Sequence, residues 1–140
     1  MSLTRPALKL THRAALLLLQ AAEAAAAAIG VPQVIIVVDE GCNVLACLRM
    51  DGSRLLSADT ATHKAMTAAA SGRPSGGLPA DVELKLGLAS HGRMTNLKGG
   101  LPIVIDGHVV GGIGVGSGSG DQDVQVAQAA LDALSAALAG

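Results

Sequence analysis

Charged side chains are scarce in this sequence, so the few that lie among apolar residues are the first candidates for chemistry. Only 15% of the 140 residues are charged, whereas 50% are hydrophobic. Arg49, Asp51, Lys64 and Arg73 stand among apolar residues, and Asp39 follows a β-branched run. A buried lysine is costly unless a carboxylate balances its charge, and Asp39, Asp51 or a bound acid could supply that carboxylate.

Such groups could bind a small organic acid and transfer a proton without a cofactor, as isomerases, tautomerases and lyases do. Under this hypothesis we predict Lys64, Asp39 and Arg49 as the catalytic residues. The alternative interpretation is a set of ion pairs at a subunit interface, which would stabilise an assembly and carry no chemistry. The sequence leaves both interpretations open.

Histidine and sulfur side chains are the candidate ligands for a haem iron, which needs an axial ligand and an apolar slot. The candidates are His12, His63, His91, His108, Cys42, Cys47, Met50 and Met94. Each histidine is equally compatible with a surface position. The chain has no Phe, Tyr or Trp, which counts against a porphyrin slot with aromatic walls. Four residues separate the cysteines and no close histidine pair joins them, so no metal site is predicted.

Charge and composition argue against several classes of partner. The formal net charge is -1, and the chain has neither a basic run nor a stacking ring, so nucleic acid is not expected. Gln20 and Glu23 interrupt the apolar stretch 16–28, which is too short and too polar to span a membrane. The N-terminus lacks the apolar core of a secretory signal. Two cysteines fit a reduced protein, and we therefore expect a cytoplasmic location.

The length of 140 residues predicts a single domain over residues 1–140. Two Ala-rich segments have little polar face, and the hydrophobic content is high for so small a surface. We therefore expect a homo-oligomer, at least a dimer, in which some of this apolar surface closes against other copies.

Hydrophobic periodicity and turn residues predict five mainly antiparallel strands flanked by helices. The expected strands are 7–10, 34–38, 44–49, 101–105 and 108–115, and the expected helices are 12–29, 58–71, 80–86 and 121–138. Thr11 and Ser57 are the expected N-caps of the first two helices, and Ser119 with Gln122 has capping-box spacing. Asp106-Gly107 between two apolar runs is a strong hairpin signal.

The glycine-serine run at 116–120 directly precedes the last predicted helix. Backbone N–H groups at such a helix start could hold an anion. A flexible turn before a capped helix is an equally good interpretation, because the run lacks the lysine of a P-loop.

Four segments in order resemble the GlcG/HbpS-like haem-binding family. The first two are Val37 to Gly41 with Leu48 to Gly52, and the helix segment His63-Lys64-Ala65-Met66-Thr67-Ala68, which is similar to a Lys-Ala-x-Thr-Ala core. The third is Gly99 to Ile103 with Val110-Gly111-Gly112-Ile113-Gly114-Val115, and the glycine loop with Asp123 follows. Together these segments cover nearly the whole chain.

This resemblance implies an α/β (α+β) fold of the profilin-like type, a three-layer sandwich with a five-stranded sheet, assembled as dimers to octamers. It implies haem or a related planar small-molecule ligand, since members include haem-binding proteins and domains fused to cobalamin adenosyltransferases. Other members lie beside catabolic enzymes, so an accessory role in a catabolic pathway is also compatible. Some relatives bind haem through a histidine near the N-terminal helix, where His12 lies. The predicted ligand-binding residues are His12, His63, Asp51, Thr67, Gly112 and Gly114.

Overall fold

The computed structural model describes residues 1–140 and contains four helices and four strands. In chain order they are α1 (His12–Ala28), β1 (Val34–Asp39), β2 (Val44–Arg49), α2 (Ser57–Ser71), α3 (Ala80–Ala89), β3 (Gly100–Ile105), β4 (His108–Gly116) and α4 (Gly120–Ala139). The strands form one antiparallel sheet in the order β2-β1-β4-β3. None of the helices is long and apolar enough to cross a membrane.

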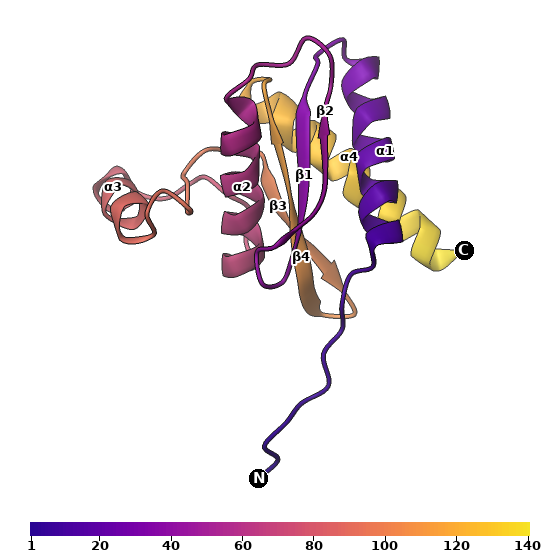
Figure 1. The fold of residues 1–140 in the computed structure, drawn as a ribbon, viewed down its shortest axis with the longest axis vertical. Helices are drawn as coiled ribbons and strands as arrows, with labels where there is room; N and C mark the ends of the chain where they lie inside the picture. Colours follow the sequence, from indigo (N-terminus) through magenta and orange to yellow (C-terminus); the bar gives the residue numbers. More distant parts are fainter.

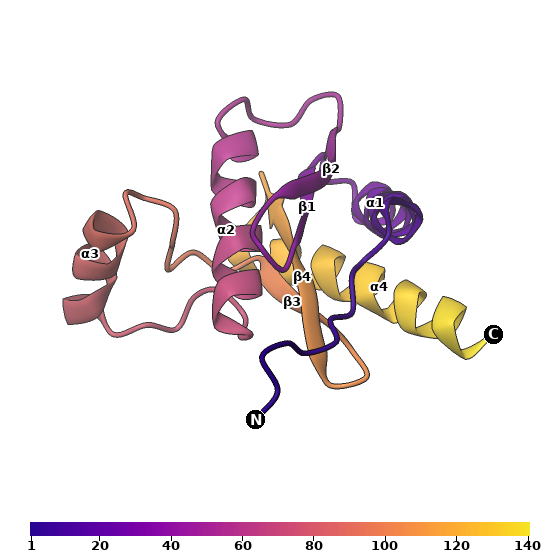
Figure 2. The ribbon, with the colours of Figure 1, turned by 60° about the horizontal axis from the view of Figure 1, so that its bottom comes forward.

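The sheet lies between two helical layers, with α1 and α4 on one face and α2 on the other (Figures 1 and 2). β1 is buried on both faces because its side chains alternate between these layers. Ile35 and Val37 join the larger core under α1 and α4, and Val34, Ile36 and Val38 pack under α2. Burial on both sides explains why β1 is a continuous β-branched run.

The expected fifth strand at 7–10 does not form, and the sheet has four strands. This segment lies in an extended N-terminal part of the chain that leads away from the sheet (Figure 1). Only Leu10 is buried in it, and it pairs with no strand. The backbone N–H and C=O groups of a strand need a neighbouring strand to bond to. The weak alternation of apolar and polar residues over four positions carries no information about such a neighbour.

Local signals located the starts of α1 and α4, but α3 extends to Ala89, three residues beyond its expected end, and the expected cap of α2 was wrong. Thr11 caps α1 by accepting a hydrogen bond from the Ala14 amide, and Ser119 and Gln122 form the predicted capping box of α4. Ser57 is not the cap of α2, because the helix begins at Ser57 itself and Leu56 precedes it. The Ser57 side chain is therefore not used to cap the helix.

Glycines in β4 allow α2 to lie directly on the sheet. A Cβ atom on Gly112 would overlap the carbonyl oxygen of Ala65, and one on Gly114 would overlap that of Ala61. Both glycines were predicted as ligand-binding residues. The structure covers them with α2, so their contribution to any site is to bring this helix, and Lys64 on it, close to the sheet.

We expect Gly114→Ala to lower the free energy of unfolding by about 1–3 kcal/mol, the range found for overpacking a core. Urea unfolding followed by circular dichroism would measure it, since the chain lacks Trp and Tyr. Gly87→Ala is the matched control, because Gly87 lies in α3 with no atom within 4 Å of an added Cβ. Equal stability of Gly114→Ala and the parent would show that α2 is not held as closely as described.

Candidate functional site

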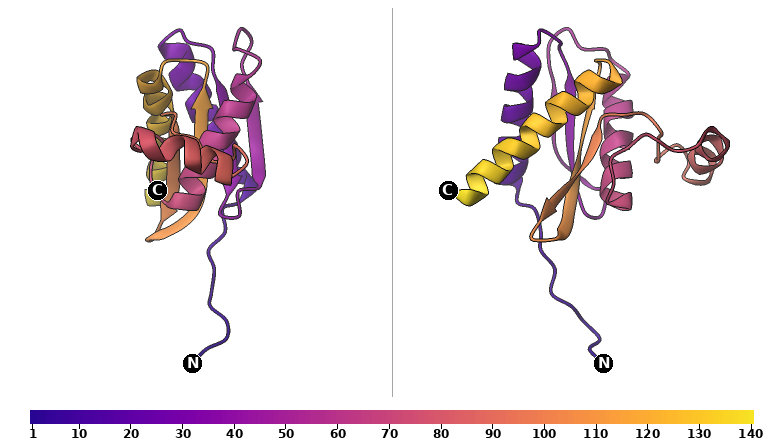
Figure 3. Two further views of the ribbon diagram at one scale, coloured as in Figure 1. Left: turned by 90° about the vertical axis from the view of Figure 1, so that its left-hand side faces the viewer. Right: turned by 180° about the vertical axis from the view of Figure 1, so that it is seen from behind.

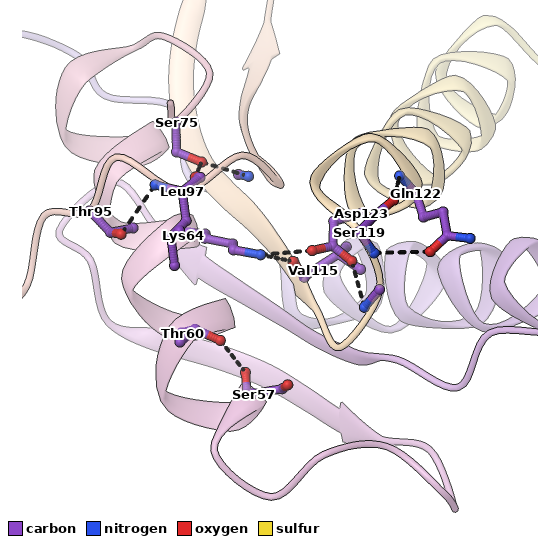
Figure 4. A network of polar contacts seen from close by, with 12 residues as sticks. Ser57, Thr60, Lys64, Ser75, Thr95, Leu97, Val115, Ser119, Gln122 and Asp123 are labelled. Atoms are coloured by element: carbon purple, nitrogen blue, oxygen red, sulfur yellow. Dashed lines mark hydrogen bonds and ion pairs between the residues drawn. The ribbon is translucent and has the colours of Figure 1, made fainter. Parts of the chain in front are cut away.

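A buried ion pair joins α2 to α4 at one end of the sheet (Figure 4). The Lys64 ammonium lies 2.8 Å from Oδ2 of Asp123, and their side chains are only 6% and 2% exposed. The same ammonium donates a hydrogen bond of 2.9 Å to the carbonyl oxygen of Val115 in β4. Lys64 thus connects three elements through one nitrogen atom.

The second carboxylate oxygen of Asp123 is also held by donors. The Gly118 amide donates to Oδ1 at 3.0 Å. The side-chain amide of Gln33 donates to the same oxygen at 2.9 Å and to the carbonyl oxygen of Gly116 at 2.9 Å, in the orientation that satisfies both of its ends. Gln33 is fully buried, so these bonds satisfy a side-chain amide that water does not reach.

Burial raises the pKa of the Asp123 carboxyl above its ordinary value of 3.8, and the donors from Lys64, Gly118 and Gln33 act in the opposite direction. A raised pKa makes an ionised carboxylate a better proton acceptor.

The raised pKa of Asp123 also makes the stability of the fold depend on pH. The folded chain binds this proton more tightly than the unfolded chain, so the contribution of Asp123 to stability decreases as pH rises from 3.8 through the raised pKa.

A small cavity of about 310 Å³ opens beside this pair. Lys64 and Asp123 line it together with the start of α2, the loop from β4 to α4, and residues 97 and 98 before β3. We call it the lysine cavity. Its polar lining residues are Arg54, Ser57, Thr60, Lys64, Lys98, Ser117 and Asp123.

A larger cavity of about 690 Å³ adjoins it between α2 and the segment that contains α3. Thr60 and Leu97 line both cavities. His63 from α2 and His91 from the turn after α3 line the larger one, which we call the histidine cavity. Leu84, Leu88 and Met94 supply apolar surface there.

The expected partners of Lys64 were wrong, since its carboxylate is Asp123 and not Asp39 or Asp51. Lys64 and Asp123 lie near Gly116, which pairs with Val34 at the start of β1. Asp39 is at the other end of this strand, about 16 Å from Val34 at about 3.3 Å per residue. Its carboxylate accepts hydrogen bonds of 2.9 Å from the Gly41 and Asn43 amides.

Asp39 therefore closes the turn between β1 and β2. Desolvation alone would raise the pKa of Asp39, but these amides and the Asn43 side chain hold it below its ordinary value.

The other predicted residues divide between the cavities and the surface. His63 lines the histidine cavity, whereas Arg49, Asp51 and His12 are exposed and line neither cavity. Thr67 is buried, donates to the carbonyl of His63 at 2.7 Å and accepts from the Thr95 amide at 2.9 Å. Thr67 thus ties α2 to the segment after α3.

Comparison with known proteins agrees with this architecture. Residues 10–132 match the family described as haem degrading protein HbpS-like. An uncharacterised 15.0 kDa protein from the dhaT-dhaS intergenic region of Citrobacter freundii is 36% identical over 131 residues, which are 90% of this chain and 92% of that protein.

Two solved structures superimpose on most of the chain. The protein ORFY of Klebsiella pneumoniae has a TM-score of 0.89 at 31% identity and covers 97% of both chains. A complex of PduOC with haem has a TM-score of 0.83 at 30% identity, covering 90% of this chain and 95% of that one. With its helix-sheet-helix layers and a family match that extends from Leu10 into α4, this chain belongs to the HbpS-like family.

Proposed function

We propose that this protein binds haem, or a closely related planar ligand, in the histidine cavity. The observation that carries the proposal is that His63 and His91 line the same cavity, together with apolar side chains. A relative of similar fold is a haem complex, which supports the ligand class. A volume of about 690 Å³ lies within the usual range for cofactor and ligand pockets.

The residues of the cavity fit a haem by their donor chemistry. Imidazole and thioether groups are common axial ligands of haem iron, and His63, His91 and Met94 provide both kinds. No three His, Cys, Asp or Glu side chains are grouped to hold a bare metal ion, so iron would be held by the porphyrin and one or two axial ligands. A bound haem supplies the iron chemistry, while the chain supplies ligands and apolar walls.

The position of His12 favours the other two histidines as ligands. His12 is exposed at the first residue of α1, which packs on the opposite face of the sheet from α2 (Figure 1). His63 and His91 lie on the α2 side and line the cavity. We therefore assign the axial role to His63 or His91.

A hemin titration followed by absorbance tests this proposal. We expect a saturable shift of the Soret band near one haem per chain or per dimer. The double variant His63→Ala/His91→Ala should bind hemin at least about tenfold more weakly, because it loses the protein's ligands to iron. His108→Ala is the control, since His108 is exposed at the start of β4.

Non-saturating binding that is equal in all variants would mean adsorption and would refute the proposal. Loss of the Soret shift only in His12→Ala would refute the assignment of the ligands.

We also propose that the chain works as a homo-oligomer, because α3 has no core of its own. No residue of α3 is buried, and the helix stands away from the sheet (Figure 3). A ten-residue helix is marginally stable in water without packing. Its exposed Val82 does not line the histidine cavity and therefore indicates a partner surface.

The total exposed area supports this assembly. The chain exposes 7896 Å², whereas a folded monomer of this mass exposes about 6,600 Å². The extended residues 1–9 account for part of the excess of about 1,300 Å². A stable interface covers about 800 Å² on each partner, so a second copy packed on α3 would bring the area into the normal range.

A further inference from the structure

The lysine cavity has an excess of positive charge. Arg54, Lys64 and Lys98 line it, and Asp123 is its only acidic residue. Lys98 forms an ion pair of 3.1 Å with Asp121, but both side chains are exposed, so this pair is weak and easily exchanged. The Arg54 guanidinium takes part in no ion pair.

The Ser57 hydroxyl group in the same cavity has no hydrogen-bond partner within the chain. Ser57 is only 7% exposed and lines the cavity, and its Oγ atom neither donates nor accepts a hydrogen bond within the chain. Its carbonyl oxygen is the atom that accepts from the Thr60 hydroxyl, one turn along α2 (Figure 4). Because no buried side-chain oxygen of the chain is left unpaired, this hydroxyl is accessible from the cavity and is free to bond to a ligand.

Lys64 also has one donor left. An ammonium group carries three N–H bonds, and only Asp123 and Val115 accept from it. α4 begins at Gly120 beside the cavity, and the start of a helix carries a partial positive charge. The cavity therefore combines net positive charge, an unpaired hydroxyl and a free N–H.

We propose that the lysine cavity binds a small organic carboxylate, held by the Ser57 hydroxyl, the Arg54 guanidinium and the free N–H of Lys64. A planar guanidinium pairs well with a carboxylate through two parallel hydrogen bonds. A volume of about 310 Å³ is at the low end for ligand pockets, so the acid has only a few carbon atoms. The proposal does not depend on haem, which we place in the adjoining histidine cavity.

Isothermal titration calorimetry tests this site. The purified protein is titrated with pyruvate, succinate and inorganic phosphate, and pyruvamide is the uncharged control. We expect saturable binding of at least one of the two acids at one per chain, weakened by added salt. Ser57→Ala and Arg54→Gln should each weaken it by about tenfold, since each removes a hydrogen bond to a charged group. These variants leave the Lys64–Asp123 pair intact.

Arg13→Gln is the matched control, because Arg13 is an exposed arginine of α1 that lines neither cavity. Equal affinities in all three variants would overturn the proposal, as would pyruvamide binding as tightly as pyruvate. Tighter binding of phosphate than of either acid would overturn the assignment to carboxylates. Absence of saturable binding by either acid to the unmodified protein would overturn the site.

Discussion

Replacing Lys64 with methionine is expected to lower the free energy of unfolding by about 3–5 kcal/mol, the usual cost of breaking a buried ion pair. Methionine is close to lysine in length and leaves the Asp123 carboxylate buried without its counter-charge. Chemical unfolding followed by circular dichroism would measure the loss. This loss of stability should be among the largest that a single substitution causes in this chain, because the side chains of Lys64 and Asp123 are both nearly inaccessible.

Lys85→Met is the control, since Lys85 lies exposed on α3 and makes no ion pair. The double variant Lys64→Met/Asp123→Asn should recover part of the lost stability, because asparagine carries no charge and its side-chain oxygen can still accept from Gly118 and Gln33. If Lys64→Met unfolds like the parent, Lys64 is not buried against Asp123 and the site as described does not exist.

A charge on α3 is expected to break the assembly. In Val82→Asp, a carboxylate replaces a side chain that we place against a second copy and that does not line the histidine cavity, and charge is strongly disfavoured in the centre of an interface. Sedimentation or light scattering at micromolar concentration should give a multiple of 13.8 kDa for the parent and a smaller multiple for the variant.

Leu138→Asp is the control for added charge, since Leu138 is exposed near the end of α4, on the other side of the molecule from α3 (Figure 1). A parent mass of 13.8 kDa would contradict the oligomer outright. Equal masses for the parent and the α3 variant would place the interface elsewhere.

Much of the fold could be predicted because its signals are local. The Asp106-Gly107 turn has positive φ at both residues, as the tight hairpin requires, and the capping box of α4 follows directly from two side chains. The β-branched run of β1 indicated burial on both faces. The expected strand at 7–10 failed because pairing is not a local property, and no strand was there to receive it.

The site could be predicted only in part for the same reason. Lys64 stood out as a lysine among alanines on a helix, and the structure buries it. Its partner Asp123 is 59 residues away, and the two meet because α2 and the first turn of α4 lie at the same end of the sheet. Gln33 gave no signal at all, because a glutamine before a strand is ordinary until the carboxylate and carbonyl that it bridges are known.

The histidine cavity depends on a similar long-range meeting. His63 belongs to α2 and His91 to the turn after α3, and the sequence gives no spacing that relates them. His12 was favoured by the family resemblance alone.

A crystal structure of the protein loaded with hemin would test the central claim most directly. Our account predicts the porphyrin between α2 and the α3 segment, with its iron bonded to the imidazole of His63 or His91. Iron bonded to His12, or a porphyrin bound outside the histidine cavity, would contradict it.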